Sequence, residues 1–259
     1  MGSPDPNRRQ AFERIGLGLG GVAAGAAVGS PPSAHAAVRP VAGGPAPGLD
    51  LKAVVKVLGR LDGAPTCHQE RGALYGLRPG EPPRLLLAFD GCAIRRFHAR
   101  TDGGFDLEAQ SWVLFRDPAT GETTDVWLNP YTLETVAPAH MRHSDPPVRL
   151  APRPGAWTAD WTLDAHLAVC VIEMGAARDL RTVTTSRAAL DDWAAVTAPA
   201  IETWTRTSAW PAFLNMANWS GQVLWRGSAR KVDRPVGLDA GLSAAIEARW
   251  PGSLAAAAA

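Results

Sequence analysis

The sequence lacks several features that would point to a specific class of protein. Its 259 residues carry 26 basic and 25 acidic side chains, for a formal net charge of +1. No excess of positive charge therefore favours nucleic acid or an anionic membrane as a partner. The sequence also contains no P-loop, no His-Glu-x-x-His motif and no Gly-x-Ser-x-Gly nucleophile elbow. These absences leave no sequence signature of a P-loop NTPase, a zincin protease or an α/β-hydrolase.

Cysteine is scarce as well. The three cysteines are Cys67, Cys92 and Cys170, an odd number without Cys-x-x-Cys spacing. The chain can therefore form at most one intramolecular disulfide, and a cysteine zinc site is not expected. An oxidising compartment would permit such a disulfide, but the spacing does not indicate which two cysteines would form it.

Residues 1–36 have the pattern of an export signal. The pair Arg8-Arg9 precedes a mildly apolar Gly/Ala run, Ile15–Gly29, and Ala34-His35-Ala36 forms an A-x-A cleavage site. This arrangement resembles a twin-arginine signal, which implies the twin-arginine translocation machinery as a partner during export. The alternative is a disordered or membrane-anchoring tail, although the Gly-rich run is too short to cross a bilayer comfortably. We expect a periplasmic or secreted protein.

The remainder of the chain predicts one domain. Residues 37–50 are rich in Pro, Gly and Ala and indicate a flexible linker. Residues 51–251 form the predicted single domain, and residues 252–259 form a low-complexity tail. No segment after residue 36 approaches the length of a transmembrane helix, so we expect no stable membrane insertion once the signal is removed.

Alternating polar and apolar residues, interrupted by short turns, predict antiparallel hairpins. The three clearest strand-like runs are Thr66–Leu77, Arg84–Arg100 and Phe105–Arg116, with turn signals at Pro79-Gly80 and Asp102-Gly103 between them. Further strands are predicted at Asp125–Asn129, Glu134–His143, Trp157–Met174 and Gln222–Val232. Helical patterns occur at Ser186–Ile201 and Leu238–Arg249. The predicted fold is mainly β: a hairpin-connected, closed or half-open β-barrel with one or two helices near the C-terminus.

Two groups of short motifs resemble one protein family. The first group is Asp117-Pro118-x-Thr120-Gly121-Glu122, Trp127-x-Asn129-Pro130, His140 and Asp145-Pro146. The second is Trp204-Thr-Arg206-Thr-Ser-x-Trp210-Pro211, followed by Met216 and Gly221. Together they resemble the domain of unknown function 1838 family over roughly residues 51–251. The resemblance implies a shared fold and brings no activity, because the family has none assigned.

The histidines of the first motif are the candidate catalytic residues. On a strand, His143 and Asp145 share one face and His140 lies on the other. His143 with Asp145 could form a general base and its orienting carboxylate. A metal site would need a further ligand, for which His68, His98 and His166 are the candidates. The remaining alternative is a hydrogen-bonded histidine beside a turn.

Ten tryptophans are the second unusual feature. Most should belong to the core, but an aromatic barrel interior would also suit an apolar or ring-shaped ligand. Trp204 and Arg206 share a strand face, as a structural cation–π pair or as an element that recognises an anion. Arg95 and Arg96 face opposite ways, so one of them can enter the interior. The predicted ligand-binding residues are Arg95, Trp112, Trp127, Asn129, His140, Trp204 and Arg206.

Three functional hypotheses follow from these features. The first is an exported protein that binds a small, largely apolar or aromatic ligand in a Trp-lined barrel pocket. The second is a cofactor-independent hydrolase or isomerase that uses His143 and Asp145, with Arg206 in the same cavity. The third is a structural or partner-binding envelope protein. None of them requires a metal, a cofactor or nucleic acid.

Overall fold

The computed structural model describes residues 51–150, 157–164, 167–173, 180–232 and 234–259. Within these ranges, side chains are described except at residues 145–146, 157–164, 167–173 and 180–181. All described residues belong to one compact unit, Pro47–Ala259. The predicted signal and linker lie outside the described residues and stay predictions.

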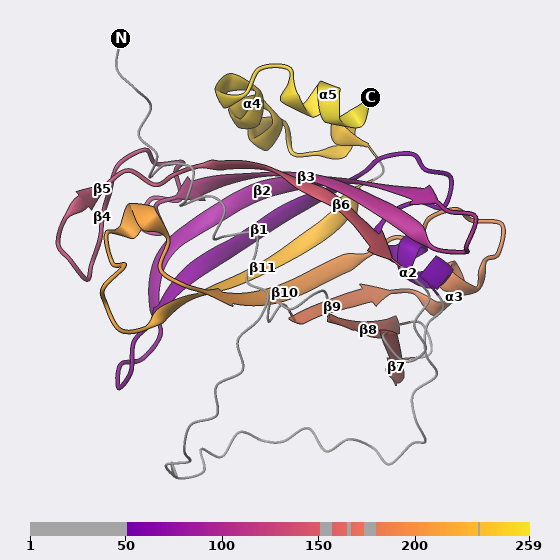
Figure 1. Cartoon of the computed structure of the whole chain (residues 1–259), viewed down its shortest axis with the longest axis horizontal. Coiled ribbons are helices and arrows are strands. Elements are labelled where there is room, and N and C mark those ends of the chain that lie inside the picture. Colours follow the sequence, from indigo (N-terminus) through magenta and orange to yellow (C-terminus); the bar gives the residue numbers. More distant parts are fainter. Residues whose placement is uncertain (1–50, 151–156, 165–166, 174–179, 233) are drawn as a thin grey trace. The chain divides into compact units, whose positions relative to one another are not determined.

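The unit is built on one nine-stranded sheet (Figure 1). The strands lie in the order β6-β3-β2-β1-β11-β10-β9-β8-β7, and every neighbouring pair is antiparallel. Their bounds are β1 (Thr66–Leu77), β2 (Arg84–Ala99), β3 (Phe105–Arg116), β6 (Met141–Leu150), β7 (Trp157–Asp164), β8 (Leu167–Glu173), β9 (Leu180–Thr185), β10 (Ile201–Ser208) and β11 (Gln222–Val232). A separate hairpin joins β4 (Trp127–Leu128) to β5 (Thr135–Val136). The prediction of a mainly antiparallel β fold is confirmed.

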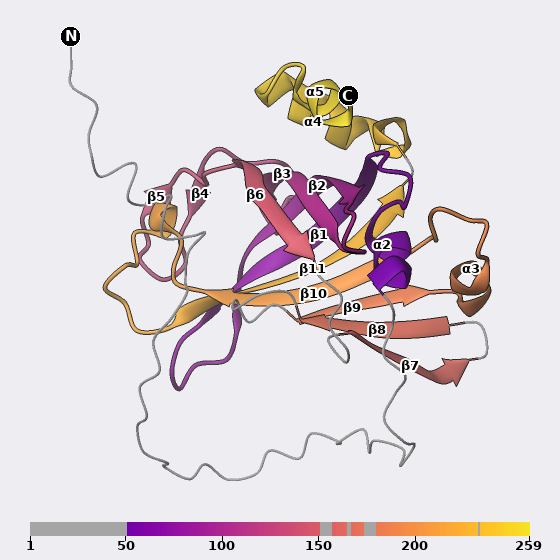
Figure 2. The ribbon, with the colours of Figure 1, turned by 45° about the vertical axis from the view of Figure 1, so that its right-hand side comes forward.

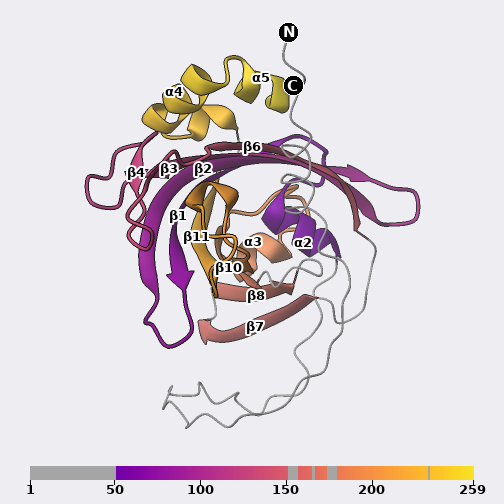
Figure 3. The same cartoon turned by 60° about the vertical axis from the view of Figure 1, so that its left-hand side comes forward.

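The sheet is not closed into a barrel in the described part of the chain. Its two edges are β6 and β7, which follow each other in sequence, and no ladder connects them there. Of the two predicted forms, the closed barrel is therefore not observed in the described part of the chain. An open, strongly curved sheet is its observed form (Figure 3).

The strands β1, β3 and β11 have the predicted bounds, and β2 ends one residue before its predicted end. The glycines of the turn signals, Gly63, Gly80, Gly103 and Gly121, all adopt positive φ. On β1 the alternation places Cys67 on one face and His68 on the other, as expected of adjacent strand residues. Arg95 is buried and Arg96 is only partly buried, which fits the predicted split of that pair.

The helices are α2 (Leu51–Leu58), α3 (Arg187–Asp191), α4 (Ala240–Arg249) and α5 (Ser253–Ala258), with short 3-10 turns η1 (Ala212–Leu214) and η2 (Pro235–Gly237). The predicted helical stretch from Ser186 to Ile201 forms only α3. Ser186 caps its N-terminus by accepting a hydrogen bond from the Ala189 N–H. No helix of the described residues is long and apolar enough to span a lipid bilayer.

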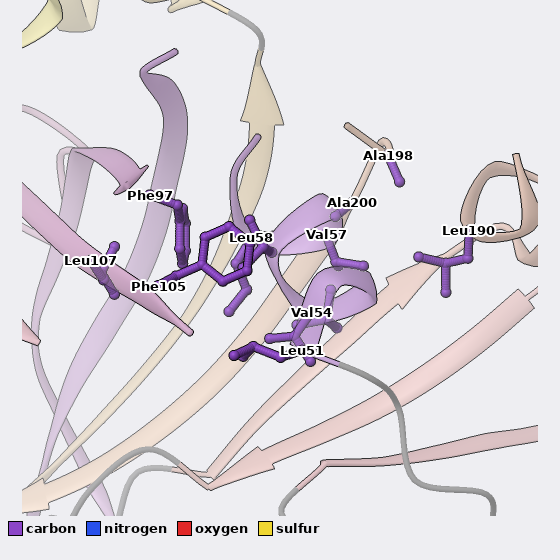
Figure 4. Close-up of a cluster of buried hydrophobic side chains, with 12 residues drawn as sticks. Leu51, Val54, Val57, Leu58, Phe97, Phe105, Leu107, Leu190, Ala198 and Ala200 are labelled. Atoms are coloured by element: carbon purple, nitrogen blue, oxygen red, sulfur yellow. The ribbon is translucent and has the colours of Figure 1, made fainter. Parts of the chain in front are cut away.

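Different helices cover the two faces of the sheet, which we call the inner and the outer face. On the inner face, α2 packs against apolar side chains of β2 and β3, among them Phe97 and Leu107 (Figures 3 and 4). On the outer face, α4 and α5 cover a second cluster that includes Cys67, Cys92 and Trp112 (Figure 2). Cys67 and Cys92 are buried free thiols, whereas the Cys170 side chain is not among those described.

Two of the three lysines fasten α2 to its neighbours. Lys56 Nζ lies 2.7–3.2 Å from the carbonyl oxygens of Ala189, Leu190 and Asp192 and so binds the C-terminal end of α3. Lys231 Nζ lies 2.7 Å from the Lys56 carbonyl oxygen and 2.5 Å from that of Gly59, at the C-terminal end of α2. Ammonium groups suit these positions because the last carbonyls of a helix have no partner within it.

Candidate functional site

The centre of the inner face is an aromatic surface built over two glycines. Gly72 of β1 and Gly227 of β11 pair directly, with Phe89 of β2 beside Gly72 and Trp204 of β10 beside Gly227. A Cβ at Gly72 would lie 2.3 Å from the Phe89 ring, and one at Gly227 would lie 2.7 Å from the Trp204 ring. The two rings therefore lie over bare backbone and approach each other, with centroids 5.8 Å apart.

Further rings extend this surface. Trp225 lies 5.9 Å from Phe89 and 5.9 Å from Phe115 between ring centroids. We name the four residues Phe89, Phe115, Trp204 and Trp225 the aromatic floor. Phe89 and Phe115 are buried, whereas Trp204 and Trp225 are only partly buried. The two indoles thus present ring area that the described residues do not cover.

The Trp204 indole has an unused hydrogen-bond donor. Its Nε1 is inaccessible to solvent and has no hydrogen-bond partner among the described residues. Buried indole N–H groups normally have a partner, because leaving one without costs about 1–3 kcal/mol. By contrast, Nε1 of Trp225 donates to the Ser208 hydroxyl at 3.1 Å. Trp204 is therefore a partly exposed residue whose indole N–H is buried without a partner among the described residues.

A buried charged cluster lies next to the aromatic floor. Glu202 is two residues before Trp204 on β10 and faces the same side of the sheet. Arg95 donates to both carboxylate oxygens of Glu202, at 2.5 and 3.2 Å. Nδ1 of His68 lies 2.9 Å from Glu202 Oε1, and Nε2 of His68 lies 3.0 Å from the Leu58 carbonyl oxygen. The cluster joins β1, β2 and β10 to the end of α2.

The protonation of this cluster follows from its surroundings. Burial disfavours the charged carboxylate of Glu202, but Arg95 and His68 outweigh that effect and hold its pKa well below the ordinary value. Burial and the charge of Arg95 lower the pKa of His68 to about 4, although Glu202 opposes them. At neutral pH, a carboxylate and a guanidinium thus compensate each other beside a neutral imidazole. Both ring nitrogens face an oxygen acceptor, Nε2 the Leu58 carbonyl and Nδ1 the Glu202 carboxylate, so a neutral imidazole can donate its one proton to either of them.

The predicted ligand-binding residues fall in several places. Arg95, Trp204 and Arg206 all lie on the inner face; Arg206 is exposed and sits opposite Trp225 in the β10–β11 register. Trp127 is buried in the apolar cluster that contains the aromatic floor. Asn129 is buried beside it, donating from Nδ2 to the Leu214 carbonyl and accepting from the Tyr131 N–H. Asn129 therefore fixes a turn, which is the usual role of an asparagine before a proline, and is not shown to line a pocket.

Trp112 lies on the other side of the sheet. It pairs with Cys92 in the β2–β3 register, is fully buried and belongs to the cluster under α4 and α5. Its ring therefore packs against helices on the outer face and does not face the aromatic floor. The sequence pattern alone could not separate these faces, because it gives alternation along a strand and not which side is covered.

His140 precedes β6 and is held by hydrogen bonds. Its Nδ1 accepts from the Phe115 N–H at 2.9 Å, so the ring proton is on Nε2, which lies 3.1 Å from Oδ1 of Asp125. Arg249 of α4 donates to the same oxygen at 2.6 Å. Burial lowers the pKa of His140, with Arg249 adding to the effect and Asp125 opposing it. This is the hydrogen-bonded histidine beside a turn that the sequence left as an alternative.

The predicted catalytic pair lies on the edge strand β6. His143 is exposed and pairs with Ser111, and Asp145 is opposite Ala109, so their register positions are on the inner face. The Asp145 side chain lies outside the described side chains. Arg206 is on β10, with four strands between it and β6 in the sheet order. The described residues contain no group of three or more His, Cys, Asp or Glu side chains that could hold a metal ion.

Comparison with protein families supports one part of the sequence interpretation. Residues 63–150 match the family model "Protein of unknown function (DUF1838)". The DUF1838 match spans β1 to β6 and includes the first motif group, so it supports the predicted resemblance over that part of the chain, whereas the second motif group lies beyond it. It contains His68, Gly72, Phe89 and Arg95, whereas Glu202 and Trp204 lie beyond it. Neither the curated proteins nor the solved structures give a match.

Sequence reasoning missed several residues of the site. Gly72 and Gly227 were not singled out, although a glycine inside a strand pattern often marks a close approach to the backbone. Glu202 was also missed, although alternation places it on the face of Trp204. Its pairing with Arg95 depends on β1 and β11 lying between β2 and β10, and no local pattern encodes that order.

Proposed function

We propose that this is an exported protein that binds a small, largely apolar or aromatic molecule on the inner face of its sheet. The observation that carries the proposal is Trp204, whose buried Nε1–H has no partner among the described residues and whose ring is partly uncovered. A ligand ring would stack on Trp204 and Trp225, which contribute large apolar area without losing much side-chain entropy. Because Nε1 is covered when no ligand is bound, the indole would turn on binding, and an acceptor atom on the ligand would then take the Nε1 hydrogen bond.

The buried charged cluster supports a neutral ligand, because its charges are compensated and it holds β10 in place. The charges of Glu202 and Arg95 neutralise each other, so the cluster has no net charge that would attract a charged ligand. It does fix β10 relative to β1 and β2, and thereby the position of Trp204. The curved sheet acts in this proposal as a half-open barrel with the aromatic floor inside.

The acid–base alternative has one supporting observation. His143 and Asp145 occupy positions on the inner face of β6, the face that carries the aromatic floor. A ligand bound on the floor could thus reach an imidazole on the sheet edge. On this second hypothesis the protein would convert its ligand, and a His143→Gln variant would keep binding while losing turnover.

Two fluorescent probes test the binding proposal. Prodan is a neutral naphthalene ketone that can accept a hydrogen bond, and N-phenylnaphthylamine offers a similar ring area without a carbonyl. We expect both to bind with a blue-shifted emission. Trp204→Phe keeps an aromatic ring but removes the donor, so it should weaken prodan roughly fivefold, as expected for one lost hydrogen bond. The same change should leave N-phenylnaphthylamine nearly unaffected.

The matched control is Trp193→Phe, because Trp193 is 86% exposed and lies outside the sheet. This variant should bind both probes like the wild type. The binding proposal is wrong if neither probe shifts its emission with the wild type, or if Trp193→Phe and Trp204→Phe weaken prodan equally. Independently of the probes, native mass spectrometry of protein purified from its own host would identify a co-purified ligand by its mass.

A further inference from the structure

The outer face carries a group of arginines that the proposed function does not use. On β1 and β11, Arg71 is directly opposite Ser228, and Arg226 and Arg230 lie two residues to either side of Ser228. Strand alternation therefore places the three arginines and Ser228 on one face of the sheet. We name Arg71, Arg226, Arg230 and Ser228 the arginine group. All four residues are exposed.

Part of this group lines a hollow of about 560 Å³. Arg71, Ser228 and Arg230 contribute its polar wall, together with Gln69. Ile201 of β10, which is 55% exposed, and Leu238, next to η2, contribute apolar area. The hollow thus offers cationic and hydroxyl groups on one side and an apolar surface on the other.

The lining of the hollow carries an excess of positive charge, because Arg71 and Arg230 contribute two guanidinium groups and Asp239 one carboxylate. Within the described part of the chain, neither Arg226 nor Arg230 forms an ion pair. Arg71 lies 3.4 Å from Asp90, but Asp90 also pairs with Arg116. Asp239 lines the hollow, and its Oδ1 accepts from the Leu242 N–H as the N-cap of α4. Like charges this close repel each other unless an anion lies between them.

One of the arginines is also held in place. Oε1 of Gln69 accepts from Arg230 at 3.3 Å and from the Asp239 N–H at 3.2 Å. Gln69 therefore connects the Arg230 guanidinium to the start of α4. A guanidinium fixed in this way loses less side-chain entropy when it binds an anion.

We propose that this hollow binds the oxyanion group of a small amphipathic molecule, a phosphate or a carboxylate. Arg71 and Arg230 donate to its oxygens, Ser228 adds a hydroxyl donor, and Arg226 contributes charge from the edge. The apolar part of the molecule lies against Ile201 and Leu238. The site is independent of the aromatic floor, because the two lie on opposite faces of the sheet.

Calorimetry of the whole domain with three probes tests the proposal. Inorganic phosphate tests the oxyanion alone, octyl phosphate adds the apolar part, and octanoate replaces the phosphate by a carboxylate. We expect octyl phosphate to bind more tightly than inorganic phosphate, and the binding to weaken with rising salt. Arg230→Gln and Arg71→Gln should each weaken octyl phosphate about tenfold or more, as expected for a lost charge-assisted hydrogen bond. Octanoate measures whether a carboxylate serves equally.

Arg149→Gln is the control, because Arg149 is an exposed arginine on β6 with a 70% accessible side chain. It should bind all three probes like the wild type. Unchanged melting temperatures would show that the variants fold. The proposal is overturned if no probe binds, if Arg149→Gln weakens binding as much as Arg230→Gln, or if octyl phosphate binds no more tightly than inorganic phosphate.

Discussion

At the scale of single residues, His68 is the most informative side chain of the inner face. It is fully buried between Glu202 and the end of α2, and its pKa is lowered to about 4 from the ordinary 6.5. Between these two pH values the unfolded chain binds a proton that the folded chain does not bind. The free energy of unfolding therefore falls as the pH falls from 6.5 to 4. The full effect of this one group is about 3 kcal/mol.

We expect His68→Gln to flatten the dependence of stability on pH in that window. Gln keeps a donor for the Leu58 carbonyl oxygen but does not titrate. Urea unfolding at a series of pH values between 4 and 7 measures the slope. Some slope should remain, because burial also lowers the pKa of His140. Below about pH 4.5, protonation of Glu202 should add a further loss, since its pKa is likewise held below that value.

The exposed His98 provides the comparison for this experiment. Its ring lies 3.3 Å from Glu108 on the surface, and its side chain is 45% accessible. His98→Gln should leave the slope of the wild type unchanged. A wild-type slope in His68→Gln would show that the buried imidazole does not control the acid sensitivity of the fold.

At the scale of elements, the sequence predicted strands better than helices. β1, β3 and β11 were found because alternation and glycine turns are local signals. The predicted helix from Ser186 to Ile201 is mostly irregular, because Lys56 binds carbonyl oxygens at the end of α3 and Lys231 binds that of Ala198. Those contacts join residues more than thirty positions apart. A local pattern therefore could not indicate where α3 ends.

The same limit applies to the candidate site. Arg95, Trp204 and Arg206 were predicted individually as ligand-binding residues, and the structure places all three on the inner face. Trp112 was also predicted as a ligand-binding residue because it is one of many tryptophans, but it lies under α4 and α5. Which face a helix covers depends on chain connections after the strand. The sequence therefore indicated residue types for the site and could not indicate their grouping.

Lys231 tests whether the connection between α2 and its neighbours determines stability. Its Nζ also lies 2.6 Å from Oγ1 of Thr197, in addition to the carbonyl oxygens at the end of α2. Lys231→Met keeps most of the apolar stem but leaves these partly buried acceptors without a donor. We expect the free energy of unfolding to fall by roughly 2–3 kcal/mol. Denaturant unfolding measures this change.

Lys52 is the matched control, because it is an exposed lysine on α2, the helix whose C-terminal end Lys231 contacts. Lys52→Met should change the free energy of unfolding by less than about 0.5 kcal/mol. Equal losses in both variants would mean that removal of positive charge, and not the hydrogen bonds of Lys231, destabilises the protein.

At the scale of the whole molecule, the two faces of the sheet differ in chemistry. The inner face carries the aromatic floor and a compensated ion pair, whereas the outer face carries a hollow lined by two arginines and one carboxylate, that of Asp239. Helices cover parts of both faces, and the uncovered parts are those that we assign to ligands. Prodan and octyl phosphate should therefore bind without competing. Because the two sites are separate, a failure of prodan to bind would leave the oxyanion site untouched, and a failure of octyl phosphate would leave the aromatic floor untouched.

The export proposal concerns the whole chain and depends on its first residues. If the twin-arginine interpretation is right, the protein recovered from its host should begin at Ala37, after the Ala34-His35-Ala36 site. Mass spectrometry of the intact protein measures this directly. Replacing Arg8 and Arg9 by lysines keeps the charge but removes the feature that distinguishes this signal from the general secretory type. The variant should accumulate uncleaved inside the cell, whereas Arg14→Lys, outside the pair, should be exported normally. Efficient export of the double variant would contradict the twin-arginine route, and a protein that still carries residues 1–36 would contradict cleavage after Ala36.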